Sequence, residues 1–144
     1  MTDEYIIKQL SIFAENKAGK LAAIAKIFHD TGVSIQAFNI AEANNFGVVR
    51  AIVDKPKVAF DEFAKHNYAL QYTDVIAIKM RDVPGGLHEV AKVMGNLSIN
   101  IEYAYAFRSG DYGALIVKVA NPRDAVSKIL DAGLELLPAK DYNF

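Results

Sequence analysis

Apolar and polar residues alternate along several short stretches of the chain. In residues 5–14, Leu10, Ile12 and Ala14 fall on one face while Ser11 faces the other way. A period of two is typical of a β-strand with one buried face. The same alternation returns later in the chain, at Ile76, Ile78 and Met80.

Helical spacing follows each of these strands. The apolar residues recur three or four positions apart at Leu21, Ile24, Ala25 and Phe28, and again at Leu87, Val90, Ala91 and Met94. Proline is favoured in the first turn of a helix, so a second helix is expected to begin near Pro56 and near Pro122. Asn121 is expected to cap the helix that begins at Pro122. The remaining predicted strands are 33–40, 46–53 and 68–73 in one half and 99–107, 112–119 and 134–138 in the other.

The two halves of the chain are copies of one unit. Gly19 corresponds to Gly85, an offset of 85 − 19 = 66 positions, and at the same offset Pro56 meets Pro122 without a gap. Apolar positions meet apolar positions throughout, which indicates an internal repeat. We expect an α+β protein of two tandem ferredoxin-like βαββαβ units, each with an antiparallel sheet and helices on one face.

Residues 1–73 form the first predicted domain and residues 74–144 the second. Between Tyr68 and Met80 there is no Gly or Pro, so the last strand of one unit nearly runs into the first strand of the next. We therefore expect the two domains to pack tightly, because nothing at their junction resembles a flexible linker.

A glycine-containing loop joins the first strand of each unit to its first helix. Gly19 and Gly85 allow the backbone to approach another group closely. The helix N-terminus beyond each loop presents N–H groups and a positive dipole end, which can hold a carboxylate. Asn16 or Asp82 could then take an ammonium or amide, or simply cap the turn. A tight strand-to-helix turn requires glycine for geometry alone, so the loop by itself leaves both interpretations open.

The second loop and its surroundings resemble the ACT domain. The resemblance lies in residues 82–87, followed by an apolar helix and residues 99–102. The first copy, residues 16–21 followed by 33–35, is less similar because Ala18 stands where the family usually has proline. The resemblance extends over nearly the whole chain, in two copies.

This resemblance implies a regulatory domain that binds a small molecule, usually an amino acid, at the interface between domains. In the family, the ligand is held by the strand-to-helix loop of one domain and by the start of the second strand of its neighbour. The implied binding residues are Asn16, Lys17, Ala18, Gly19, Lys20 and Leu21 with Asn100 and Ile101, and Asp82, Val83, Pro84, Gly85, Gly86 and Leu87 with Ser34 and Ile35. His88 lies beside the second loop and is included in this set. Some serine-binding members carry a histidine two residues before the loop Asn; Ala14 and Met80 stand there, which argues against serine by that route.

The composition excludes several other classes of protein. Hydrophobic residues make up 52% of the 144, enough for a packed core. Sixteen basic and 17 acidic residues leave a net charge of −1, which offers no long-range attraction to nucleic acid or to an anionic membrane. The chain has no Cys, so disulfides and thiolate chemistry are excluded. No apolar run approaches the roughly 20 residues that span a bilayer, and the acidic N-terminus does not resemble a signal peptide. We expect a cytoplasmic protein.

Candidate catalytic groups are sparse. His29, His66 and His88 do not share a helix face at metal-binding spacing, and none has an obvious carboxylate partner. We expect these histidines at the surface or at helix ends. Arg108 and Asp111 are expected to form an exposed pair at a hairpin turn. No nucleophile is paired with a base.

Three functions are compatible with this order of strands and helices. The preferred hypothesis is a non-catalytic sensor that binds a free L-amino acid, uses no metal or cofactor, forms a homodimer and acts on a biosynthetic enzyme or regulator. The alternative is a small enzyme of the acylphosphatase type, but that activity needs an arginine cradle for phosphate, and no Arg follows Gly19 or Gly85. An RNA-recognition module needs basic residues and exposed aromatics on the third strand; residues 46–50 and 112–116 supply one aromatic each. The amino acid itself is not specified by the loops.

Overall fold

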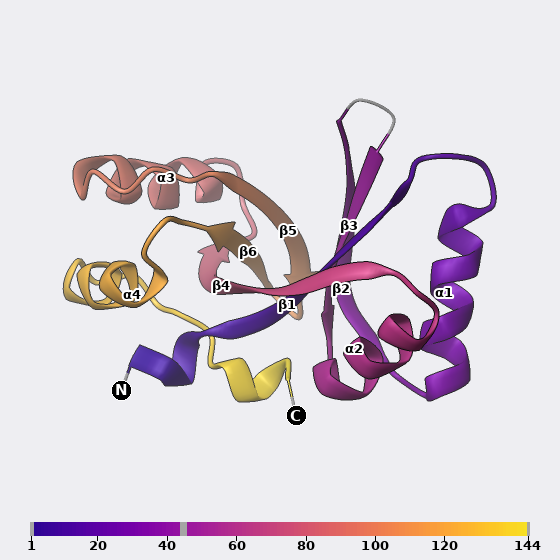
Figure 1. The fold of residues 1–144 in the computed structure, drawn as a ribbon. Helices are drawn as coiled ribbons and strands as arrows, with labels where there is room; N and C mark the ends of the chain where they lie inside the picture. The colour runs from indigo at the N-terminus through magenta and orange to yellow at the C-terminus, as the bar shows by residue number, and fades with distance from the viewer. Residues whose placement is uncertain (1, 44–45, 144) are drawn as a thin grey trace. The chain divides into compact units, whose positions relative to one another are not determined.

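The computed structural model describes residues 2–43 and 46–143, which form two compact units. The first unit consists of residues 8–73 with Tyr142 and Asn143, and the second unit consists of residues 2–7 and 74–141. The N-terminal residues 2–7 of the first repeat therefore belong to the second unit, and Tyr142 and Asn143 of the second repeat belong to the first unit. The predicted α+β class is confirmed, since each unit has antiparallel strands with two helices on one side (Figure 1).

The first unit contains β1 (Ile7–Glu15), α1 (Lys20–Thr31), β2 (Ile35–Ala43), β3 (Phe46–Val53), α2 (Pro56–Lys65) and the start of β4 (Ala69–Arg81). Strand β3 lies between β1 and β2 and is antiparallel to both. Strand β4 lies on the other side of β1, where the Ser11 and Thr73 hydroxyls are 2.9 Å apart.

The register of these strands places their side chains in rows beneath the helices. Leu10, Ala51 and Phe38 form one row, and Ile12, Val49 and Ile40 form the next. The row nearest the β1–α1 loop consists of Ala14, Gly47 and Glu42, and we call it the loop row of the first unit.

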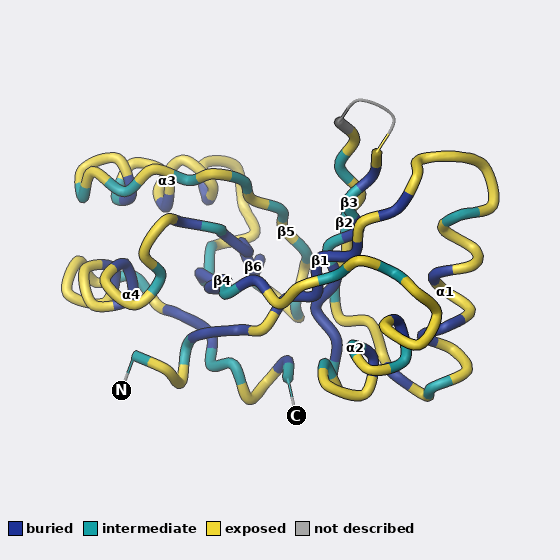
Figure 2. The backbone as a smooth tube through the Cα atoms, in the orientation of Figure 1, coloured by how far each residue is buried: buried dark blue, intermediate teal, exposed yellow. Residues whose placement is uncertain are grey.

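The core of the first unit lies between these rows and the two helices. Ile24 and Phe28 of α1 pack with Phe63 of α2 over Leu10 and Ile12. The Phe63 ring meets Phe28 edge-on at 4.9 Å between centroids. The alternation of buried and exposed positions along α1 follows its sequence periodicity (Figure 2), and Gly32 ends the helix in the left-handed conformation at φ 68°.

The second unit repeats this arrangement. It contains η1 (Thr2–Tyr5), residues 74–81 of β4, α3 (Gly86–Asn96), β5 (Tyr103–Ser109), β6 (Tyr112–Lys118), α4 (Pro122–Asp131) and η2 (Ala139–Asp141). Its loop row, at the equivalent positions, consists of Met80, Gly113 and Arg108. The Arg123 guanidinium donates to Asp3 at 2.7 Å and to Asp74 at 3.3 Å, which joins η1 and the start of the β4 portion to α4.

Three sequence predictions need correction at strand ends. The segment 134–138 is not a full strand: it makes one isolated bridge, Ile78 with Leu136, flanked by two backbone hydrogen bonds of 2.9 Å. Pro138 ends this segment, because proline has no N–H to continue the ladder. Strand β5 begins at Tyr103 and not at 99, after Ser98 turns the chain with φ 57°. Tyr5, predicted in a strand, belongs to η1.

Two other sequence predictions are confirmed. The predicted strand at 68–73 and the following strand with Ile76, Ile78 and Met80 form one uninterrupted strand, β4, of 13 residues, which begins at Ala69. The Asn121 side chain caps α4 by accepting a hydrogen bond from the Asp124 N–H at 3.3 Å. A cap of this kind satisfies one of the four N–H groups that a helix leaves without a partner.

The C-terminal Asn143 gives the first prediction. Its side chain accepts from the Lys8 N–H at 2.8 Å and donates to the Val53 carbonyl at 2.8 Å. Asn143→Ala removes both bonds and should lower the free energy of unfolding by about 1–2 kcal/mol, measured by urea denaturation. Lys140→Ala is the matched control, because Lys140 is exposed. Equal stability of the two variants would show that Asn143 does not hold the chain end on the first unit.

Candidate functional site

The β1–α1 loop of the first unit borders a hollow of about 370 Å³. Such a volume is within the range of about 300–1,000 Å³ for small-molecule sites. Gly19 turns the chain into α1 with φ 87°, a conformation that favours glycine. The hollow is lined by Ala14, Glu15, Asn16, Lys17, Ala18, Gly19, Lys20, Leu21, Ile24, Ile40, Gly47 and Val49. The structure thus brings all six predicted loop residues of the first repeat, 16–21, to one cavity.

The floor of this hollow was not identified from the sequence. Ala14 and Gly47 come from the loop row, Ile40 and Val49 from the next row, and Ile24 from α1. These residues are distant in sequence, and only the strand register brings them together. A Cβ atom added to Gly47 would find its nearest atoms at 3.6 Å, the Ala14 carbonyl oxygen and Asn16 Cβ. Ala14 and Gly47 therefore contribute little side-chain volume to the floor of the hollow.

Polar groups stand at the rim of the hollow. The Asn16 side-chain amide donates to Glu42 Oε2 at 2.6 Å. This bond uses one of the two N–H groups of the amide, and the amide oxygen is the acceptor that a ligand could use. The Lys17 ammonium lies 3.3 Å from a Glu15 carboxylate oxygen, and the Lys20 ammonium lies 5.3 Å from the centre of the Tyr68 ring. The rim thus offers both an acceptor and a cation.

A smaller apolar hollow of about 140 Å³ lies beside the first one. Leu21, Ile24 and Val49 line both cavities, and Phe28, Ile35, Phe38 and Ala51 are among the residues that complete the smaller one. Phe38 is 50% exposed and Leu21 is 44% exposed. The apolar lining therefore continues away from the loop, along the face of β2.

In the second unit, the equivalent loop packs tightly against its own backbone, with Gly86 next to Arg81. Gly85 has φ 91°, like Gly19, but the next residue differs. A Cβ atom on Gly86 would overlap the Arg81 carbonyl oxygen, so only glycine fits there. Lys20 occupies this position in the first unit. Beneath the loop, a Cβ atom on Gly113 would lie 3.0 Å from Met80 Cε, so the Met80 side chain covers this glycine.

The charges around the second loop also differ from the sequence prediction. Arg108 was expected to pair with Asp111, but its Nε donates to Asp82 at 2.8 Å. Arg108 and Asp82 meet because Arg108 belongs to the loop row, directly below the loop. A hollow of about 440 Å³ beside this loop is lined by Lys79, Met80, Arg81, Asp82, Val83, Asp111, Tyr112 and Glu135. Lys79 and Tyr112 lie on the strand face opposite α3, because side chains alternate along a strand.

The other predicted site residues do not line the hollow at the first loop. The Ser34 N–H donates to the Asp54 carboxylate at 2.9 Å, and Ile35 lines the small apolar hollow. Asn100 lines a separate hollow of about 260 Å³ near the start of α4, and Ile101 packs against the second core. Pro84, Gly85, Leu87 and His88 are exposed.

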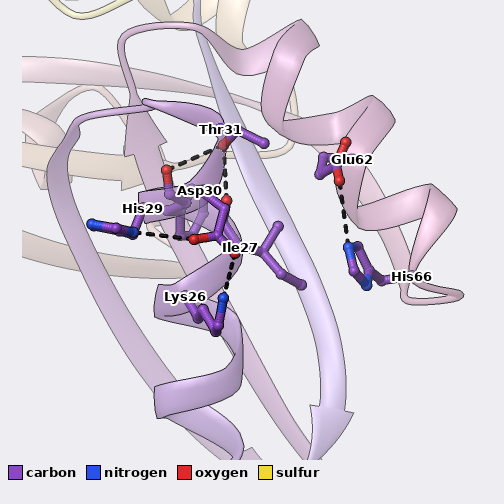
Figure 3. A network of polar contacts seen from close by, with 8 residues as sticks. Lys26, Ile27, His29, Asp30, Thr31, Glu62 and His66 are labelled. Atoms are coloured by element: carbon purple, nitrogen blue, oxygen red, sulfur yellow. Dashed lines mark hydrogen bonds and ion pairs between the residues drawn. The ribbon is translucent and has the colours of Figure 1, made fainter.

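Two of the three histidines have carboxylate partners, which corrects the sequence prediction. His29 Nδ1 lies 3.1 Å from the carboxylate of the adjacent Asp30, and His66 Nε2 lies 3.4 Å from Glu62, one helical turn away (Figure 3). Hydrogen bonds from Lys26 and then from His29 lower the pKa of Asp30. Both pairs are exposed and lie near helix ends. Ion pairs of this kind are common on helix surfaces, so they do not indicate a catalytic centre.

No group of three or more His, Asp or Glu side chains is placed to hold a metal ion within residues 2–43 and 46–143. Across the same residues, no helix combines the length and apolar character needed to cross a membrane.

The fold and its two loops define a class of protein: a duplicated ferredoxin-like module with a glycine loop at the start of the first helix of each copy. The chain belongs to the ACT domain pair family, whose model matches residues 5–143. The resemblance to the ACT domain is thereby confirmed. A search of curated proteins finds no match.

Solved structures share this fold. Protein BT0572 from Bacteroides thetaiotaomicron is 31% identical over 95% of both chains, with a TM-score of 0.89. The regulatory subunit of aspartate kinase from Thermus thermophilus, in its ligand-free form, is 13% identical, with a TM-score of 0.65 over 92% of this chain and 96% of that one. The corresponding subunit from Thermus flavus is 11% identical, with a TM-score of 0.57 over 89% and 93%.

The closed second loop gives the second prediction. Gly86→Ala forces a Cβ atom against the Arg81 carbonyl and should destabilise the protein by about 1–3 kcal/mol, the usual cost of overpacking. Gly95→Ala, in the same helix, meets no atom within 4 Å and should stabilise it by about 0.5–1 kcal/mol. Thermal unfolding compares the two variants. If Gly86→Ala leaves the unfolding temperature unchanged, the loop is open in solution.

Proposed function

We propose that the protein is a non-catalytic regulatory module that binds a free L-amino acid. The observation that carries this proposal is the hollow of about 370 Å³ at the β1–α1 loop of the first unit. It combines an apolar floor, polar groups at its rim and the N-terminus of a helix. An amino acid presents the matching features: a carboxylate, an ammonium and a side chain.

The carboxylate is assigned to the start of α1. The first N–H groups of a helix lack partners within the helix and attract anions. Gly19 brings the backbone close to the ligand at this point, and Lys20 supplies a positive charge at the rim. The ammonium is assigned to the Asn16 amide oxygen and the nearby Glu42 carboxylate, which the Asn16 amide nitrogen already holds. The side chain then faces Ile24, Ile40 and Val49.

A regulatory role agrees with the membership of the ACT domain pair family. The Thermus thermophilus protein of similar fold is the regulatory subunit of aspartate kinase. By analogy, we propose that this chain responds to its amino acid by acting on a biosynthetic enzyme or on a regulator. It needs no metal or cofactor for binding of this kind.

A thermal-shift screen of the twenty L-amino acids tests the proposed ligand class, with the D-enantiomers as controls. A ligand at 100 times its dissociation constant should stabilise the protein by about 2.7 kcal/mol. A built pocket distinguishes the enantiomers, whereas a nonspecific solvent effect does not. Stabilisation by an acyl phosphate or by RNA, with no response to any amino acid, would contradict the proposal.

We also propose that two chains form a homodimer through β2. This strand is the outer strand of the first unit, and an outer strand tends to pair with another chain. Its helix-side residues Phe38 and Ile40 are 50% and 44% exposed. An exposed apolar face beside an open strand edge is typical of an association surface.

Sedimentation equilibrium tests the homodimer. The unmodified chain should sediment as a dimer, and Phe38→Asp should shift it to the monomer because it places a charge in the apolar interface. Val58→Asp is the control: Val58 is also exposed, but it lies on α2. A monomeric unmodified protein, or a dimer unaffected by Phe38→Asp, would exclude this interface.

A further inference from the structure

The two repeats have diverged at the row of side chains beneath the loop. Ala14, Gly47 and Glu42 occupy this row in the first unit, and Met80, Gly113 and Arg108 occupy it in the second. Both rows have the same register and the same central glycine. Every difference between them is therefore a difference in side-chain volume or charge.

The side chains beneath the two loops differ in volume. Ala14 ends at its Cβ atom and lines the first hollow together with Gly47, where an added Cβ atom would find its nearest atoms at 3.6 Å. At the equivalent place, Met80 Cγ and Cε lie 3.1 and 3.0 Å from where a Cβ atom of Gly113 would stand. A ligand side chain cannot share that space with Met80, because atoms in a packed interior do not overlap.

The charged side chains near the two loops also differ between the units. In the first unit, the Glu42 carboxylate accepts a hydrogen bond from the neutral Asn16 amide, so this pair carries one negative charge. In the second unit, the Arg108 guanidinium neutralises Asp82 at 2.8 Å. An ammonium is attracted to a carboxylate that has only a neutral partner, and it gains little from one that is already in an ion pair.

The larger hollow of the second unit offers no better site for an amino acid. Five of its eight lining residues are charged: Lys79, Arg81, Asp82, Asp111 and Glu135. Lys79 lies 3.6 Å from Glu135, and Asp82 bonds to Arg108. Lys79 also lies 4.6 Å from the centre of the Tyr112 ring. Most of the residues that line this hollow are charged, whereas the hollow of the first unit adjoins an apolar cavity with which it shares Leu21, Ile24 and Val49.

We infer that the first unit alone holds the amino-acid site, and that its ligand carries an apolar side chain. This inference rests on the proposed function. Ile24, Ile40 and Val49 face the ligand side chain, and the adjoining cavity adds Phe28 and Phe38. A charged or hydroxylated side chain would lose its hydrogen bonds to water there without replacement, whereas a branched aliphatic or aromatic one would be desolvated favourably.

Isothermal titration calorimetry of the full chain tests the inference, with L-leucine, L-isoleucine and L-phenylalanine as apolar probes and L-serine and L-aspartate as polar probes. The expected result is one site per chain and at least about tenfold tighter binding of the best apolar probe than of the polar probes.

Three variants locate the binding site. Ala14→Met introduces the side chain that stands at the equivalent position of the second unit, and it should abolish this binding. Glu42→Arg, on an exposed residue, should weaken it by about tenfold or more without affecting folding. Ala23→Met is the matched control, since Ala23 is exposed on α1 and lines neither cavity.

The outcomes separate this inference from the proposed function. If no amino acid binds the unmodified chain, the proposed function fails and the inference fails with it. If an amino acid binds, but at two sites per chain, with a preference for the polar probes, or with unchanged affinity in both Ala14→Met and Glu42→Arg, the inference alone is wrong. Loss of binding in Ala14→Met but not in Ala23→Met, with Glu42→Arg also weakened, supports it.

Discussion

The antiparallel register of the strands is the constraint on which the rest of the site depends. Once Ala14 stands opposite Gly47, and Gly47 opposite Glu42, the side chains beneath the loop are determined. A shift of one residue would turn every side chain of the strand to the other face. That shift would also expose Leu10 and Ile12, which are fully buried under α1 and α2. The hydrophobic core therefore holds the site's floor in place.

The two repeats share this strand register and loop backbone but differ in the side chains beneath their loops. The glycines that begin α1 and α3 have nearly the same conformation, at φ 87° and 91°. The backbone constraint is thus shared by both loops, and glycine satisfies it whether or not a ligand is bound. The side chains around it differ, since Ala14 and Gly47 line the hollow at one loop and the Met80 side chain covers Gly113 at the other. The shared backbone geometry therefore does not by itself define the chemistry of either loop.

Exposed apolar surface is also distributed unequally between the helix-side faces of the two outer strands. Phe38 and Ile40 of β2 face the helix side of the first unit, and the equivalent positions in β5 are Ala104 and Ala106. A large apolar side chain left in water favours association, whereas alanine contributes little. The unit with the open hollow is therefore also the unit with the more apolar outer strand. Ligand binding and chain association would then involve neighbouring surfaces of one unit.

The sequence alone determined the duplication, the order of strands and helices, the loop positions and the Asn121 cap, because all of these follow from local periodicity and from residues with strong backbone preferences. It could not determine which residues face one another across strands. Alternation indicates the face of a side chain, but cross-strand partners depend on hairpin register over long separations, as for Asn16 with Glu42 and Arg108 with Asp82. Tertiary structure alone decided that the Met80 side chain covers Gly113 whereas Ala14 and Gly47 line a hollow, because packing in a dense interior depends on neighbours that are distant in the chain.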